Sequence, residues 1–395
     1  MQNFGCCFFN HDFCNKNKSN LTNAFQRKKL FMGFRYCIIG LPNVGKSTIF
    51  NALTAAGAEV ANYPFCTIDP NIGIVPVPDE RLEKIAALIN PPKTTYTTME
   101  FLDIAGLVKG ASRGEGLGNR FLGHIREVDA LLHIVRCFDD PNIVHVDGTV
   151  DPVRDMDIVN TELILADLET LEKRIEKTER LLKTGDKSIH RALAVYVQCR
   201  NSLNQGVPAR SLIPGGDAQD ILDELRLLTA KKVLYVANVS EGVLKGKADY
   251  VKEVEQYAIK EQSGVLVICG DIEAELQSLS REERLEFLED LGLQESGLNQ
   301  LIRLGYDLLG LMTFYTTVGP ELRAWTVPRG TKAPLAAGKI HSDMEKGFIR
   351  AEILHYEDFI RCRGLNQAKE KGLLRSEGKD YVIADGDMVL FRFNV

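Results

Sequence analysis

The chain has 395 residues, of which 45% are hydrophobic and 26% charged, and its formal net charge is −6. This composition is typical of a soluble globular protein with two or three domains, and no apolar run reaches the roughly 20 residues of a membrane-spanning helix. The mildly acidic balance argues against a protein that coats nucleic acid with its whole surface. Nine scattered cysteines, without metal-ligand spacing, indicate reduced thiols in a cytoplasmic protein.

Residues 1–31 differ from the rest of the chain. They contain three cysteines, a basic run at 27–29 and Asp12 as their single acidic residue. This composition resembles an organelle transit peptide, but no clean amphipathic helix accompanies it. We expect a disordered extension, or a stretch ahead of a start at Met32, that carries no chemistry.

Residues 40–48 match G-x-x-x-x-G-K-[ST], the loop that wraps a nucleotide's phosphates. The apolar run before it predicts a buried strand, and residues 49–56 predict a helix. Glycines and the helix N-terminus would bring backbone N–H groups to phosphate oxygens. Lys46 would reach the β- and γ-phosphates, and the Ser47 hydroxyl would ligate Mg²⁺. The predicted nucleotide contacts in this loop are Asn43, Val44, Gly45, Lys46, Ser47 and Thr48.

Two further loops have the features of nucleotide-dependent switches. Thr67 would ligate Mg²⁺ only while the γ-phosphate is bound, or it simply caps a turn. A D-x-x-G motif follows the strand predicted at 97–102. Its Asp103 would serve the outer shell of Mg²⁺, and the Gly106 N–H would contact the γ-phosphate. Leu107 stands where many GTPases have a water-positioning glutamine, which predicts slow hydrolysis or a polar group from elsewhere.

His145 lies in the loop after the buried strand predicted at 130–137. It is a candidate to orient the attacking water in place of the missing glutamine. The alternative is a surface or structural histidine, which is the commoner role of a lone histidine.

The sequence Asn-Val-Ser-Glu at 238–241 follows a predicted strand, where the base-reading loop lies in this topology. Guanine-specific switches have N-K-x-D there. In this chain Val239 replaces the lysine, and Glu241 is one methylene longer than aspartate. The Asn238 amide suits the N7 and N6 edge of adenine. Because a hydrogen-bonding site discriminates sharply, we expect ATP to be preferred over GTP.

The middle of the chain has a different periodicity. Apolar residues at alternating spacings of four and three from Ile164 to Leu182 predict a heptad seam. A break at 184–186 precedes a second amphipathic helix at 189–203. An antiparallel helical hairpin, inserted at about 153–228, fits best, and a dimerising coiled coil is the alternative.

The remaining organisation follows from these elements. We expect an α/β nucleotide-binding domain with a mostly parallel sheet at 34–287, interrupted by the hairpin. Residues 309–392 predict a separate small α+β unit with a β-hairpin and a tight turn before the last strand. No catalytic constellation occurs in that unit, so it is more typical of a binding module.

The segments 43–47, 62–70, 103–119 and 238–241, with the C-terminal unit, resemble the YchF family, also called Obg-like ATPases. The resemblance runs from about Met32 to the C-terminus. It implies an Obg-type P-loop domain of the TRAFAC class, the coiled-coil insert and a C-terminal β-grasp (TGS) domain.

The same resemblance implies a function. It implies a ribosome-associated switch that hydrolyses ATP in preference to GTP, with Mg²⁺ held by Ser47 and Thr67 and with His145 replacing the glutamine. We expect a monomer that contacts the large ribosomal subunit through the coiled coil and the TGS domain. Two alternatives remain, an Obg-type GTPase and a nucleotide-gated adaptor with negligible catalysis.

Asn43 suggests one property beyond the resemblance. An asparagine at this place in the loop would help to hold a monovalent cation beside the phosphates. We therefore hypothesise that K⁺ stimulates turnover.

Overall fold

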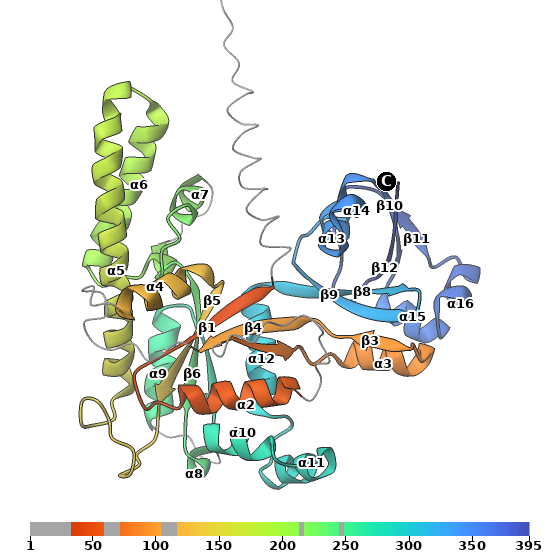
Figure 1. Cartoon of the computed structure of the whole chain (residues 1–395), viewed down its shortest axis with the longest axis horizontal. Coiled ribbons are helices and arrows are strands. Elements are labelled where there is room, and N and C mark those ends of the chain that lie inside the picture. Colours follow the sequence, from red (N-terminus) through yellow and green to blue (C-terminus); the bar gives the residue numbers. More distant parts are fainter. Residues whose placement is uncertain (1–32, 59–71, 104–116, 213–216, 245–248, 395) are drawn as a thin grey trace, which may run out of the picture.

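The computed structural model describes residues 33–58, 72–103, 117–212, 217–244 and 249–394. Figure 1 shows a central sheet, a long helical hairpin that projects from it, and a second sheet on the side away from the hairpin. Thr67, Gly106 and Leu107 lie outside the described residues, so their predicted roles stay predictions. Within the described part of the chain, no helix has both the length and the apolar character to span a membrane.

The first sheet is mostly parallel, as the sequence predicted. Only the pair β2–β4 is antiparallel. Its central strands are buried along nearly their whole length because helices cover both faces of a parallel sheet. In spatial order the strands are β2 (Ile72–Pro76), β4 (Thr98–Asp103), β1 (Phe34–Ile39), β5 (Ala130–Arg136), β6 (Lys232–Asn238) and β7 (Gly264–Ile268).

Helices pack around this sheet. The helix after the phosphate loop lies against β2 and α10, whereas α9 and α12 both pack on β6 and β7. Since the parallel strands all end at one edge, the loops that follow β1, β5, β6 and β7 meet there. The helices of this unit are α2 (Lys46–Ala58), α4 (Leu117–Glu127), α8 (Glu241–Leu244), α9 (Asp249–Lys260), α10 (Gly270–Leu276), α11 (Arg281–Asp290) and α12 (Gly297–Leu308).

The predicted hairpin is present between β5 and β6. It consists of α5 (Pro152–Leu181), the short η2 (Leu182–Thr184) and α6 (Lys187–Asn204). Asp151 caps α5 by accepting from the Arg154 N–H, and Pro152 occupies the first helical position. The expected seam is buried at four places, Ile164, Leu171, Ile175 and Thr178. An intrachain pair thus satisfies the heptad pattern.

A buried carboxylate in the middle of α5 bonds the hairpin to the residues that precede β6. Asp167 accepts hydrogen bonds from the backbone N–H groups of Leu228 and Thr229, both at 2.8 Å, and from the Thr229 hydroxyl at 2.7 Å. Burial raises the pKa of Asp167, against the lowering effect of these bonds. After α6 come η3 (Ala209–Leu212) and α7 (Asp217–Asp223), which lead back to β6.

The second sheet is mixed and belongs mainly to the C-terminal unit. A buried apolar cluster that includes Phe314, Val327, Ala351 and Phe391 lies between it and α13 and α14. Its strands in order are β11 (Arg375–Glu377), β10 (Phe348–Leu354), β12 (Met388–Phe393), β8 (Leu311–Val318), β9 (Glu321–Pro328) and β3 (Lys93–Thr95). Its helices are α13 (Ala333–Ile340), α14 (Ser342–Lys346), α15 (Tyr356–Cys362) and α16 (Leu365–Glu370).

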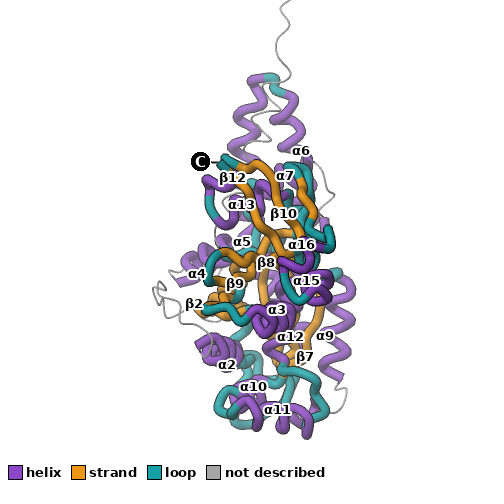
Figure 2. The backbone as a smooth tube through the Cα atoms, turned by 90° about the vertical axis from the view of Figure 1, so that its right-hand side faces the viewer, coloured by secondary structure: helices purple, strands orange, loops and turns teal. Residues whose placement is uncertain are grey.

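One segment of the nucleotide-binding half completes this second sheet. Strand β3 pairs in parallel with β9, and α3 (Glu80–Ile89) packs against α15, as Figure 2 shows. The Arg81 guanidinium donates to Asp385 at 2.9 Å, and the Tyr315 hydroxyl donates to Asp79 at 2.6 Å. The domain bounds expected from the sequence, 34–287 and 309–392, place α3 and β3 in the first unit. In the structure these two elements contact the second unit and join the two units.

Candidate functional site

The loop after β1 adopts the positive-φ backbone that a phosphate-binding loop needs. Gly40, Asn43 and Gly45 all have positive φ, at 148°, 60° and 95°. A Cβ at Gly40 would lie 2.5 Å from the Ile134 carbonyl oxygen, and a Cβ at Gly45 would overlap the Asn238 amide. Both positions therefore require glycine for space as well as for conformation.

Lys46 and Asp103 provide the charges of this site. The Lys46 ammonium group is buried and donates to the Leu41 carbonyl at 2.6 Å. Burial lowers its pKa to about 8, although the nearby Asp103 carboxylate opposes this shift. An ammonium that is held inside a loop of backbone amides fits a polyanion such as a triphosphate.

Ser47 and Asp103 form a candidate Mg²⁺ position. The Ser47 hydroxyl donates to Asp103 Oδ2 at 3.3 Å. Asp103 Oδ1 is buried and has no hydrogen-bond partner within the described part of the chain. Because a buried carboxylate oxygen without a partner is costly, the pair fits a hard cation or its water ligands.

Asn238 ties three distant segments together. Its Nδ2 donates to the Val44 carbonyl at 2.9 Å, and its Oδ1 accepts from the Gly270 N–H at 3.0 Å. The residue is only 5% exposed. The amide thus holds the phosphate loop against the start of α10.

This arrangement departs from the predicted role of Asn238. A bidentate contact with the N7 and N6 edge of adenine needs both ends of the amide, yet the structure uses Oδ1 and one N–H inside the protein. One N–H remains for a base. Val239 is buried, with its N–H bonded to the Ile268 carbonyl, whereas Glu241 is exposed at the start of α8.

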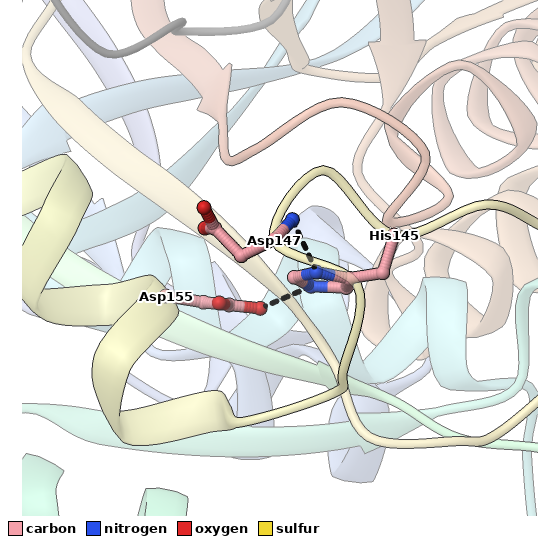
Figure 3. Close-up of side chains that lie close together, drawn as sticks. All are labelled: His145, Asp147 and Asp155. Carbon is pink, nitrogen blue, oxygen red and sulfur yellow. Dashed lines mark hydrogen bonds and ion pairs between the residues drawn. The ribbon is translucent and has the colours of Figure 1, made fainter.

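His145 lies beside the phosphate loop in the connection from β5 to α5. The preceding residue contacts that loop, because Asn43 Nδ2 donates to the Val144 carbonyl at 3.1 Å. The imidazole itself is buried. Its Nε2 lies 2.8 Å from Asp155 Oδ2, and its Nδ1 accepts from the Asp147 N–H at 3.1 Å (Figure 3). Both ring nitrogens are engaged, so this conformation leaves none to hold a water molecule.

His145, Asp147 and Asp155 offer atoms within 4.8 Å of one another, close enough for a metal ion. The positive charge that a metal ion would bring to this cluster is already supplied by Arg154, whose Nη2 donates to Asp155 Oδ1 at 3.0 Å. The Asp155 carboxylate therefore has a partner on each oxygen. We interpret the cluster as a set of hydrogen bonds that fixes the orientation of the His145 imidazole.

Sequence reasoning missed the residues that support the site. It identified Asn238 and His145 but not their partners Gly270 and Asp155, which are 32 and 10 residues away in the chain. Asp155 was recognisable only as an acidic residue in the first turn after the Asp-Pro start of a helix. Contacts between loops at a sheet edge leave no periodic pattern.

Two family models match the chain. A model described as a 50S ribosome-binding GTPase matches residues 35–167. The model YchF-GTPase_C, described as a protein of unknown function, matches residues 311–394. The two matches fall on the phosphate-loop half and on the second sheet.

Similar proteins cover almost the whole chain. The ribosome-binding ATPase YchF of Bacillus subtilis is 54% identical over 360 residues, which are 91% of this chain and 98% of that protein. The protein of the same name from Escherichia coli O157:H7 is 52% identical over 364 residues, covering 92% and 100%. The solved structure of the Schizosaccharomyces pombe YchF GTPase has a TM-score of 0.82 and 36% identity, with 91% and 98% covered.

Replacing Asn238 by alanine tests its structural role. We expect Asn238→Ala to weaken ATP and GTP binding by a similar factor of about ten, because two buried backbone groups lose their partner. Fluorescent-nucleotide titration would measure both affinities, with Asn204→Ala, an exposed change at the end of α6, as the control. A large change in the ATP-to-GTP ratio would mean that the amide reads the base.

Lys46 makes nucleotide binding depend on pH. Since its pKa is lowered to about 8 in the free protein, phosphates that restore the charged form would raise that pKa on binding. Binding should therefore take up almost no proton through Lys46 at pH 6.5 and nearly one at pH 9.

Calorimetry in two buffers of different ionisation enthalpy measures this uptake. Lys339→Met is the matched control, because burial also lowers the Lys339 pKa to about 8 while that residue lies in α13 of the second unit. Equal uptake at both pH values would contradict the prediction.

Proposed function

The chain belongs to the YchF family, and from that premise we propose that it is a ribosome-binding ATPase that acts as a nucleotide switch in translation or stress regulation. The observation that carries the proposal is the phosphate loop with its buried Lys46, fixed in shape by the Asn238 amide. A P-loop domain of this kind binds and hydrolyses a nucleoside triphosphate.

ATP is the proposed nucleotide, with GTP bound less well. The lysine and aspartate of guanine-specific loops are replaced by a buried Val239 and an exposed Glu241. A carboxylate displaced by one methylene loses its fit to guanine N1–H and N2–H₂. The Asn238 N–H that remains suits N7, which adenine and guanine share.

Mg²⁺ is the proposed cofactor, and Ser47 and Asp103 are the described residues that would hold it, Asp103 in the outer shell. Mg²⁺ would neutralise charge on the transferred phosphoryl group. Thr67 and Gly106 complete this proposal from the sequence. The loops that carry them would be ordered by the γ-phosphate and released on hydrolysis.

His145 is the proposed water-positioning group. Its loop touches the phosphate loop through Val144 and Asn43. Because the structure engages both of its ring nitrogens elsewhere, this role requires the imidazole to leave Asp155 during turnover.

The hairpin tip is the proposed contact with the ribosome, on the large subunit together with the second sheet as a TGS domain. Residues 177–191 contain five basic and two acidic residues, whereas the whole chain carries −6. The five basic side chains are exposed. A basic tip on an acidic protein fits ribosomal RNA and directs binding to that tip. We propose a cytoplasmic monomer, since the apolar seam of the hairpin is buried within the chain.

Side-by-side calorimetry with MgATP and MgGTP tests the nucleotide assignment. We expect tighter binding of ATP, and His145→Ala should lower kcat about 100-fold with little change in KM. His190→Ala, an exposed histidine on α6, is the control. Tighter GTP binding would favour an Obg-type GTPase, and unchanged kcat in His145→Ala would remove the catalytic role of this residue.

Asn43 is the proposed K⁺ contact. Its amide nitrogen is used on Val144, so its oxygen is the atom that would face a cation beside the phosphates. We expect faster ATP turnover in K⁺ than in Na⁺ buffer at equal ionic strength. Equal turnover rates in the two buffers would contradict the proposed K⁺ contact at Asn43.

Charge reversal at the tip tests the ribosome contact. Lys183→Glu with Lys187→Glu should weaken co-sedimentation with ribosomes about tenfold or more and flatten its dependence on salt, since two phosphate contacts are lost. Lys252→Glu with Lys260→Glu, on α9, is the matched control. Equal loss in both double variants would show that the tip is not the contact.

A further inference from the structure

The segment around His145 reverses the usual sorting of apolar and polar side chains. Val144 is 75% exposed, Val146 51% and Ile143 37%, whereas the histidine between them is 8% exposed. Exposed aliphatic side chains beside a buried imidazole are an unfavourable arrangement unless specific bonds hold it. The polar partners of the imidazole must therefore maintain this conformation.

The hydrogen bonds define the protonation of the ring. The Asp147 backbone N–H can only donate, so His145 Nδ1 must accept and carries no proton. Nε2 then carries the proton and donates it to Asp155 Oδ2 at 2.8 Å. The donor is neutral and the acceptor is a carboxylate, which makes this the stronger of the two bonds.

Asp155 is well placed to act as this acceptor. It is 3% exposed and lies in the first turn of α5, where the helix dipole favours a negative charge. Arg154 donates to its other oxygen from Nη2 at 3.0 Å. With a partner on each oxygen the carboxylate is fixed in place, so it holds the imidazole firmly.

The start of the connecting loop is anchored separately. Buried Arg136 donates to the carbonyl oxygens of Phe138 at 3.1 Å, Asp140 at 3.3 Å and Ile143 at 3.1 Å. The chain is next held at two anchors, the Val144 carbonyl bonded to Asn43 and Thr149 bonded to Arg154. Only a short segment between these two anchors needs to change for the imidazole to turn, and it includes Gly148 with φ +82° and open space around it.

We propose that Asp155 is a positioning residue that parks His145 in an inactive orientation, so that turnover requires this pair to open. This inference rests on the proposed catalytic role of His145. Asp155 belongs to the hairpin helix, and the helix rises about 1.5 Å per residue, so the tip near Lys183 lies about 40 Å away. A partner that shifts the first turn of α5 would change turnover through the same pair.

The test uses Asp155→Asn in the full chain. Asparagine keeps the size but replaces a charge-assisted bond by a neutral one, so kcat for ATP should rise about five- to tenfold. KM should stay constant, because within the described residues the side-chain bonds of Asp155 go to His145 and Arg154 and not to the phosphate loop. Asp157→Asn removes a carboxylate two residues further along α5, bonded to Tyr257 at 2.8 Å, and should leave kcat unchanged.

A double variant shows whether Asp155→Asn changes kcat through His145 or through a general effect on the structure. The increase in Asp155→Asn should vanish in the His145→Ala background. Unchanged or lower kcat in Asp155→Asn, with His145→Ala still impaired, would overturn the parked position and leave the catalytic role intact. If His145→Ala turns over normally, the catalytic role fails, and the inference falls with it.

Histidine-ring ¹⁵N spectra of the wild type keep the inference testable should Asp155→Asn fail to fold. The signal of His145, assigned by its loss in His145→Gln, should show the Nε2–H tautomer in nucleotide-free protein. An average of both tautomers would overturn the proposal, because a parked ring has one fixed donor.

Discussion

The site depends on one buried amide. Asn238 joins the phosphate loop at Val44 to the start of α10 at Gly270, and Gly45 packs so closely on it that no side chain fits. Strands β1, β6 and β7 bring these three segments to the same sheet edge. Since the amide holds the loop in shape before any ligand arrives, little ordering cost remains for the binding of a triphosphate.

Much of this organisation could be predicted from local patterns. Residues 40–48 carry a motif with fixed spacing, and the seam from Ile164 to Leu182 has a clear period. The structure places Lys46, Ser47 and Asp103 together, as their motifs indicated. The hydrogen-bond partners of Asn238 and His145 could not be predicted from the sequence, because the direction of a side chain in a loop depends on contacts with distant residues. The same holds for β3, three residues that pair with β9 more than 200 positions away.

Helix α5 links the nucleotide site to the basic tip of the hairpin. Its first turn carries Asp155, which holds His145. Its middle carries Asp167, bonded to the residues that precede β6. A helix with both attachments gives the hairpin a physical connection to the loop that carries His145. The segment α3–β3 joins the second sheet to the same half of the molecule, so both proposed ribosome contacts are connected to the phosphate loop.

A crystal structure with Mg²⁺ and a non-hydrolysable ATP analogue would show whether the Asn238 amide holds the phosphate loop around a triphosphate. The expected result is a triphosphate within residues 40–48, with the Lys46 ammonium group moved from the Leu41 carbonyl to a phosphate oxygen. In that result Asn238 keeps its bonds to Val44 and Gly270. A nucleotide bound elsewhere, or an Asn238 amide turned away from both segments, would contradict this expectation.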